Sequence, residues 1–295
     1  MHVDEVATDA SLVRRLVAGQ FPDWADLAIA RVPSAGTDNA IYRLGDEMAV
    51  RLPRVEWATG QVEMEHRWLP RLAPHLPLAI PTPLAMGAPA EGYPWRWSVY
   101  RWLEGENATA DRLDLRQAAT DLAAFIAALQ RIDTAGGPLA GVESSRGVPL
   151  ATRDAPTRAA IAALHDVLDT DAVTAQWEAA LRAPVWTGPG VWLHGDLNEG
   201  NLLAQHGRLT AVIDFGVMGV GDPACDLMVA WTLLTAETRE LFRAALPFDD
   251  ATWTRGLGWA LSWGLIVLPY YKNTNPGLCR IAEYTIAQVL ARGAA

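Results

Sequence analysis

The chain has 295 residues, 51% of them hydrophobic and 20% charged, a composition that excludes a wholly disordered protein. Its net charge of −10 argues against nucleic-acid binding, which relies on clustered cations. No apolar run approaches the roughly 20 residues that a membrane span needs, so we expect no membrane partner. The acidic N-terminus lacks the basic-then-apolar pattern of a signal peptide, so we expect a cytoplasmic location.

The first hundred residues are predicted to form mainly β-strands around one helix. Short β-prone runs occupy residues 27–32, 40–44 and 47–52, and turn-forming residues separate them. Apolar residues at helical spacing follow over 62–72, and an aromatic, β-branched run at 97–103 predicts another strand. This half of the chain therefore favours an antiparallel sheet with a helix packed on it.

The pattern changes from strands to helices after residue 104. Residues 134–153 are rich in Gly, Pro and Ser and are expected to form a loop. The two cysteines, Cys225 and Cys279, lack metal-ligand spacing and are expected to be small buried side chains. Apolar residues at steps of three and four predict helices over residues 115–129, 156–168, 171–182, 223–246, 250–268 and 277–292.

Strands followed by helices predict an α+β protein of two lobes, not an alternating parallel-sheet fold. The expected boundaries are 1–104 for the N-terminal lobe and 105–295 for the C-terminal lobe, with a hinge near 101–105. Of the net charge, −3 falls on the first lobe and −7 on the second. An acidic second lobe is compatible with a cationic substrate, and it also serves solubility.

Polar side chains that suit a metal ion and a reacting group cluster between residues 191 and 226. An apolar run at 191–193 leads into Asp196, and Asn201 follows five residues later. A second run, 209–213, ends at Asp214. Two carboxylates and a carboxamide at strand ends are oxygen ligands of the kind that Mg²⁺ prefers. A buried polar turn is the structural alternative, but such groups are costly to bury without partners.

The sequence HGDLNEGN followed by IDFG resembles the catalytic and metal-binding loops of the aminoglycoside phosphotransferase family, small-molecule kinases related to protein kinases. The family includes macrolide phosphotransferases. The resemblance implies a bilobal protein-kinase-like fold with an N-terminal antiparallel sheet plus one helix and a mostly helical C-terminal lobe. It implies that Asp196 orients or deprotonates a substrate hydroxyl, that Asn201 and Asp214 hold Mg²⁺, and that His194 braces the loop. The phosphate donor would be ATP or GTP.

The resemblance also requires a cation near the nucleotide phosphates, paired with a helix carboxylate. The chain has one lysine, Lys272, so an arginine must take this role. We predict Arg51, with Arg54 as the alternative, because guanidinium stays charged and can grip phosphate bidentately. The expected partner is Glu65, with Glu63 as the alternative.

The remaining nucleotide contacts implied by the resemblance involve the backbone more than side chains. The segment PSAGTDNAIY would bring the N–H groups near Gly36, Thr37 and Asn39 to the phosphates, and a plain hairpin turn is the alternative. The segment WSVYRWLEG resembles the kinase hinge, which places adenine near Arg101 and Leu103. Asp226 is predicted to tie a helix start to the catalytic loop.

The acceptor would bind in the C-terminal lobe. The aromatic candidates are Trp259, Trp263, Tyr270 and Tyr271, and a role in the core is the alternative for the two tryptophans. An aromatic wall would favour a macrolide, whereas a ring of carboxylates would favour an aminoglycoside. The sequence leaves both open.

We therefore predict an ATP- or GTP-dependent O-phosphotransferase acting on a hydroxyl of a small molecule, with an antibiotic as one candidate acceptor. One alternative is a kinase of a metabolite alcohol such as homoserine, choline or a sugar. Another is a non-catalytic nucleotide- or drug-binding relative.

Overall fold

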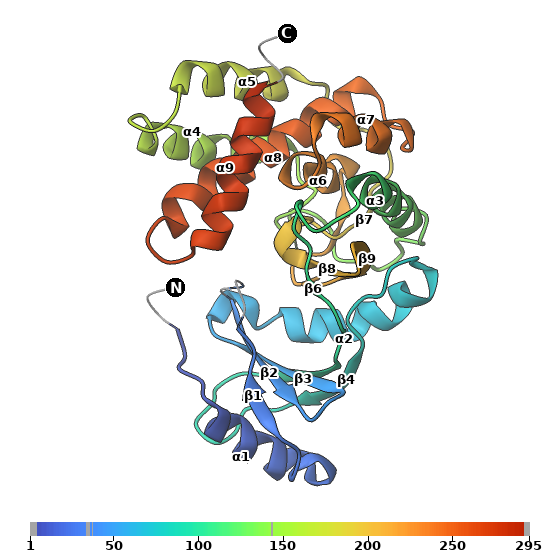
Figure 1. Ribbon diagram of the computed structural model, residues 1–295, viewed down its shortest axis with the longest axis vertical. Coiled ribbons are helices and arrows are strands. Elements are labelled where there is room, and N and C mark those ends of the chain that lie inside the picture. Colours follow the sequence, from blue (N-terminus) through green and yellow to red (C-terminus); the bar gives the residue numbers. More distant parts are fainter. Residues whose placement is uncertain (1–4, 34–35, 37, 143, 292–295) are drawn as a thin grey trace. The chain divides into compact units, whose positions relative to one another are not determined.

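The computed structural model describes residues 5–33, 36, 38–142 and 144–291 (Figure 1). Within this part the chain divides into two compact units. The first contains the described residues up to Pro74, together with Ala79–Glu104 and Val212–Gly216. The second contains His75–Leu78, Gly105–Ala211 and the residues from Val217 onward.

The first unit is built on a five-stranded antiparallel sheet in the order β1-β2-β3-β5-β4. In β2, Ala40, Tyr42 and Leu44 are buried and alternate with partly buried residues, because successive side chains of a strand point to opposite faces. The described strands are β1 (Ile29–Arg31), β2 (Asn39–Leu44), β3 (Met48–Pro53), β4 (Pro83–Gly87) and β5 (Trp97–Arg101).

The described part of this unit contains two α-helices, so the expectation of a single helix is wrong. The predicted helix is α2 (Gln61–Leu72), whose residues Trp68, Leu69 and Leu72 are buried. The second, α1 (Ala10–Gln20), begins at an N-cap where the Asp9 carboxylate accepts a hydrogen bond from the Leu12 backbone N–H at 2.7 Å. Its apolar stripe packs into the same core as the sheet.

The second unit is mostly helical, as expected. Two small sheets accompany the helices: β7 pairs with β10, and β6, β8 and β9 form the other. The strands are β6 (Glu106–Asn107), β7 (Val191–Leu193), β8 (Leu202–Gln205), β9 (Arg208–Val212) and β10 (Gly219–Gly221). The helices are α3 (Leu115–Leu129), α4 (Asp154–Ala163), α5 (Thr170–Arg182), α6 (Val229–Thr232), α7 (Ala236–Ala244), α8 (Asp250–Tyr271) and α9 (Pro276–Leu290).

Helix α8 is the central element of this unit and packs against α4, α5, α9 and the 3₁₀ segment Pro223–Met228. Gly258 permits the close packing against α5, since a Cβ there would lie 2.8 Å from the Cβ of Ala180. A buried ion pair ties the 3₁₀ segment to the helix: Arg255 donates to both carboxylate oxygens of Asp222, at 2.7 and 3.0 Å.

Two further expectations concern cysteine chemistry and the membrane. Cys225 and Cys279 are free and buried, as predicted. Among the residues that the structure describes, no helix combines the length and the apolar character that crossing a bilayer would require.

Candidate active site

In the first unit a guanidinium and a carboxylate face each other between sheet and helix. Arg51 lies in β3, where its neighbours Val50 and Leu52 point into the core, so its own side chain leaves by the other face. Its Nη1 lies 2.5 and 2.6 Å from the two carboxylate oxygens of Glu65 on α2. The Tyr100 hydroxyl also donates to Glu65. The ion pair that the sequence predicts between Arg51 and Glu65 is therefore present.

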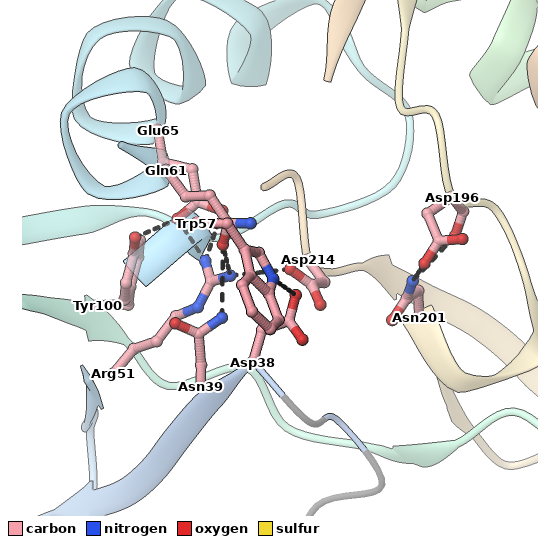
Figure 2. A network of polar contacts seen from close by, with 10 residues as sticks. All are labelled: Asp38, Asn39, Arg51, Trp57, Gln61, Glu65, Tyr100, Asp196, Asn201 and Asp214. Carbon is pink, nitrogen blue, oxygen red and sulfur yellow. Dashed lines mark hydrogen bonds and ion pairs between the residues drawn. The ribbon is translucent and has the colours of Figure 1, made fainter. Parts of the chain in front are cut away.

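The other half of the Arg51 guanidinium contacts two further oxygen acceptors, on Gln61 and Asp214 (Figure 2). Its Nη2 donates to Gln61 Oε1 at 3.0 Å and to Asp214 Oδ1 at 2.9 Å. With the Asn39 amide oxygen turned towards it, Nη2 has a third acceptor at 2.8 Å. Burial lowers the pKa of Arg51, but Glu65 and Asp214 raise it by more, so the net shift is upward. The cation is thus permanently charged.

Asp214 belongs to the first unit, although chain order places it in the predicted C-terminal lobe. The Val212 N–H donates to the Ala79 carbonyl at 2.9 Å, and this bond ties the end of β9 to the first unit. Asp214 has a φ of 63°, a left-handed conformation that costs a non-glycine residue free energy and is found at functional sites. Its side chain is 45% exposed, so Oδ2 remains open to a ligand.

The alternatives for the predicted phosphate cation and its partner have other contacts. Arg54 forms an ion pair with Glu5. Glu63 forms one with Arg96 at 2.9 Å, and both of those side chains are about half exposed. Neither alternative residue takes part in the buried contact between β3 and α2.

The expected phosphate-binding segment is described in part. Thr37 lies outside the described residues, whereas Gly36 is exposed and Asn39 opens β2. Between them, the Asp38 carboxylate accepts a hydrogen bond from Trp57 Nε1 at 3.4 Å.

The expected hinge follows β5. The Arg101 N–H donates to the Thr82 carbonyl at 2.9 Å, and the Trp102 N–H donates to the Glu47 carbonyl at 2.7 Å. For the next residue, Leu103, the described part of the chain supplies no backbone hydrogen bond.

In the second unit, a buried carboxylate shapes the loop that follows β7. Asp226 accepts hydrogen bonds from the backbone N–H groups of His194 at 2.8 Å and Gly195 at 2.7 Å. Burial raises the pKa of Asp226, and His194 opposes that shift. The Asp196 N–H in turn donates to His194 Nδ1 at 3.1 Å, so His194 braces the loop as expected.

Asp196 presents a carboxylate that is held on both oxygens (Figure 2 shows its bond to Asn201). Asn201 Nδ2 donates to Asp196 Oδ2 at 3.0 Å, and Trp263 Nε1 on α8 donates to Oδ1 at 3.1 Å. Because its Nδ2 is engaged, Asn201 has only Oδ1 left, and that oxygen makes no hydrogen bond to the described residues. The bonds fix the direction of the carboxylate and leave an amide oxygen for a cation.

The four aromatic candidates for the acceptor site differ in their surroundings. Trp263 contacts Asp196 through its indole N–H. Trp259 is 2% exposed and belongs to the core, with the Arg153 guanidinium 5.0 Å from the centre of its ring. Tyr270 is 57% exposed and packs edge-on against Tyr271, with 4.7 Å between ring centroids. Of these four side chains, Trp263 is therefore the one that forms a hydrogen bond to the predicted catalytic carboxylate among the described residues.

Comparison with known proteins identifies the class. The model of the phosphotransferase enzyme family matches residues 29–259, and the chain belongs to this family. The prediction of a phosphotransferase is thereby confirmed. No curated protein matches the chain.

Solved structures of this class share the fold. Aminoglycoside 2'-phosphotransferase-IIIa, in complex with GDP, superposes with a TM-score of 0.74 at 17% identity and covers 97% of this chain and 100% of its own. Macrolide 2'-phosphotransferase MphH from Brachybacterium faecium gives a TM-score of 0.61 at 23% identity, covering 95% and 97%. The predicted kinase-like α+β fold is confirmed.

Proposed function

We propose that this enzyme transfers the γ-phosphate of ATP or GTP to a hydroxyl of a small molecule, with Asp196 as the group that receives the hydroxyl proton. The observation that carries the proposal is the double anchoring of its carboxylate by Asn201 and Trp263. A general base must hold its oxygen in a fixed direction towards the proton it accepts. The acceptor oxygen then forms a bond to the γ-phosphorus as the bond to the β-phosphate oxygen breaks and the nucleoside diphosphate leaves.

The nucleotide would bind through the first unit. Arg51 would neutralise phosphate charge, with Glu65 fixing its direction, while the backbone near Gly36 and Asn39 approaches the phosphates. The backbone of Arg101–Leu103 would read the base. Both GDP and ATP occur in the complexes of structurally similar enzymes, so either donor fits. We expect the enzyme to act in the cytoplasm, where these nucleotides are available.

Magnesium fits the residues present. Asn201 Oδ1 and the Asp214 carboxylate would each supply an oxygen ligand, and such hard donors suit Mg²⁺. In the described ranges, no group of three His, Cys, Asp or Glu forms a closed metal cage. That agrees with an ion which takes few protein ligands and keeps water and phosphate oxygens. When bound, the ion would neutralise charge on the transferred phosphate.

The acceptor class within this proposal is a compact hydroxylated molecule. One neighbour was solved with kanamycin, and another is named a macrolide 2'-phosphotransferase, so aminoglycosides and macrolides belong in the first substrate panel.

The test is an Asp196→Ala variant in a coupled assay for nucleoside diphosphate, run with that panel. We expect turnover to fall by at least about a hundredfold, because general-base catalysis contributes about 10²–10⁴. Nucleotide affinity, measured by calorimetry, should stay within threefold or so of the wild type, since Asp196 contacts the acceptor. The control is Asp166→Ala, whose side chain is 84% exposed. Normal turnover by Asp196→Ala would refute the assignment.

A further inference from the structure

Two arginines of the second unit have no carboxylate partner in the described part of the chain. Arg146 donates through Nε to the Gly195 carbonyl at 2.9 Å and through Nη1 to Ser145 Oγ at 3.2 Å. Arg153 donates through Nε to Ser262 Oγ at 2.8 Å. The contacts leave Nη2 of Arg146 and both Nη atoms of Arg153 without acceptors among the described residues.

The position of Arg153 makes this lack of a counter-charge costly. Its guanidinium lies against the face of Trp259, and Ser262 is fully buried and also hydrogen-bonded to Thr157 Oγ1 at 2.7 Å. Burial, followed by repulsion from Arg146, lowers the pKa of Arg153 to about 10, so it remains a cation at neutral pH. A partly buried charge ordinarily has an oppositely charged partner, because otherwise no interaction offsets the hydration free energy that the group loses on burial.

Arg239, another buried arginine of this unit, illustrates the hydrogen bonding of a guanidinium with a structural role. Arg239 donates to the carbonyls of Ala230 and Leu234 and to Gln288 Oε1, at 2.8, 3.4 and 2.7 Å. Its Nε and Nη2 donors are thus used within the protein. Arg153, by contrast, donates one hydrogen bond to the described residues, through Nε, and its Nη1 and Nη2 atoms donate none to them.

Both arginines are anchored next to the predicted catalytic carboxylate. Arg146 binds the carbonyl of Gly195, which immediately precedes Asp196. Arg153 binds Ser262, which immediately precedes Trp263, and the Trp263 indole donates to Asp196 Oδ1. Arg153 is also close enough to Asp196 for the carboxylate to act on its titration. Both guanidinium groups are therefore tied to segments that hold Asp196: Arg146 through Gly195, and Arg153 through Ser262 beside Trp263.

We infer that the acceptor of this enzyme carries an anionic group, a carboxylate or a phosphate ester, which Arg153 and Arg146 bind beside Asp196. The inference rests on the proposed function and narrows its substrate class. A guanidinium fork matches the two oxygens of such a group bidentately. A polycationic aminoglycoside would instead bring ammonium groups towards two unpaired guanidinium groups, and like charges in a partly dehydrated site repel strongly.

The first test measures anion binding, with sulfate as the probe, by titration calorimetry at low millimolar concentration. We expect sulfate affinity to fall at least tenfold in Arg153→Gln and in Arg146→Gln. The matched control is Arg158→Gln, an exposed arginine of α4 paired with Asp154 at 2.8 Å, which should bind sulfate like the wild type. Equal affinity in Arg153→Gln and Arg158→Gln would overturn the inference.

Thermal unfolding separates a ligand-binding role from a structural one. Arg153→Gln removes a partly dehydrated positive charge but also the hydrogen bond to Ser262 and the contact with Trp259, so its melting temperature should stay close to that of the wild type. A clear loss of thermal stability in Arg153→Gln, matched by unchanged sulfate affinity, would assign Arg153 to the scaffold and overturn the inference.

The second test asks which anion the two arginines bind: an anionic group of the acceptor, or the phosphoryl group that is being transferred, which is also an oxyanion. Matched pairs of hydroxy acids and hydroxy amides, glycerate with glyceramide and gluconate with gluconamide, are offered together with ATP, and kanamycin is offered alongside. We expect the acids to be preferred at least tenfold in kcat/KM. Arg153→Gln should raise KM for the acids at least tenfold and leave KM for the amides within threefold of wild type, while the control Arg158→Gln should leave kcat, KM and basal ATP hydrolysis within threefold of wild type.

Two outcomes of the second test would overturn the inference. One is a preference for the amides or kanamycin. The other is a fall in kcat for acids, amides and water alike in Arg153→Gln, which would assign the arginines to the transferred phosphate. If no compound is phosphorylated, the proposed function fails, while the sulfate titration still decides whether the arginines form an anion site.

Discussion

Replacing Arg51 with methionine tests whether the buried ion pair between β3 and α2 organises the first unit. Glu65 has a side chain 1% exposed and Arg51 one 12% exposed, so the substitution leaves a carboxylate buried opposite an apolar group. Removing one partner of a buried pair costs about 3–5 kcal/mol. Since the Tyr100 hydroxyl still donates to Glu65, we expect the lower end, about 3 kcal/mol.

The assay is urea unfolding, with the free energy of unfolding taken at unchanged m-value. Arg96→Met is the matched control: it breaks a pair with Glu63 in which both side chains are half exposed, and it should cost less than about 0.5 kcal/mol. Arg51→Met combined with Glu65→Met removes both charges and should recover most of the lost stability. A loss below about 1 kcal/mol in Arg51→Met would refute the reasoning, because a buried pair with one partner removed cannot be so inexpensive.

Three further predictions concern the second unit. Arg255→Met strands the buried Asp222 carboxylate and should lower the free energy of unfolding by about 3–5 kcal/mol in urea; a loss under about 1 kcal/mol would contradict this. Asp226→Asn leaves one side-chain oxygen for the two backbone N–H groups of His194 and Gly195, and it should lower the free energy of unfolding in urea by about 1–3 kcal/mol. An unchanged free energy of unfolding would show that the loop does not depend on this carboxylate. Trp263→Phe removes a charge-assisted hydrogen bond from Asp196 and should lower kcat about tenfold with nucleotide affinity unchanged; an unaltered kcat would dismiss the positioning role.

The parts of the fold that the sequence predicts are those with strong local signals. The helix at 115–129 has the same bounds in the structure, because its apolar residues recur at the helical period over four turns. The β4 strand (Pro83–Gly87) was not predicted, since prolines precede it and lie within it. A proline lacks the backbone N–H that would bond to a neighbouring strand, but on an edge strand that N–H can face away from the sheet. β4 is an edge strand of its sheet, so it tolerates proline.

The ion pair between Arg51 and Glu65 was predictable because both residues lie in short elements whose order the family resemblance supplies. The contact of Trp263 with Asp196 spans 67 residues, and no local pattern distinguishes an indole that packs in a core from one that also donates to a carboxylate. The same holds for Arg146, whose bond to Gly195 spans 49 residues. Long-range contacts of single side chains depend on how helices pack, and periodicity says nothing about them.

The assignment of Asp214 to the first unit shows a second limit of reading along the chain. The residues before Val212 and after Gly216 belong to the second unit. Within this short segment, however, the Asp214 carboxylate binds Arg51, and Gly216 lies so close to Gln61 that a Cβ would be 2.5 Å from the side chain. Chain order alone could not reveal this return to the first unit, because a segment of five residues carries too little hydrophobic pattern to show which core it joins.

The most direct test of the account is ³¹P NMR of reactions that contain Mg²⁺, ATP and the panel of hydroxylated acceptors, with the wild type and Asp196→Asn compared at equal nucleotide occupancy. The catalytic assignment of Asp196 predicts a new phosphate monoester resonance and a stoichiometric amount of ADP in the wild type, and neither in Asp196→Asn over the same interval. Monoester formed by Asp196→Asn at the wild-type rate would contradict it.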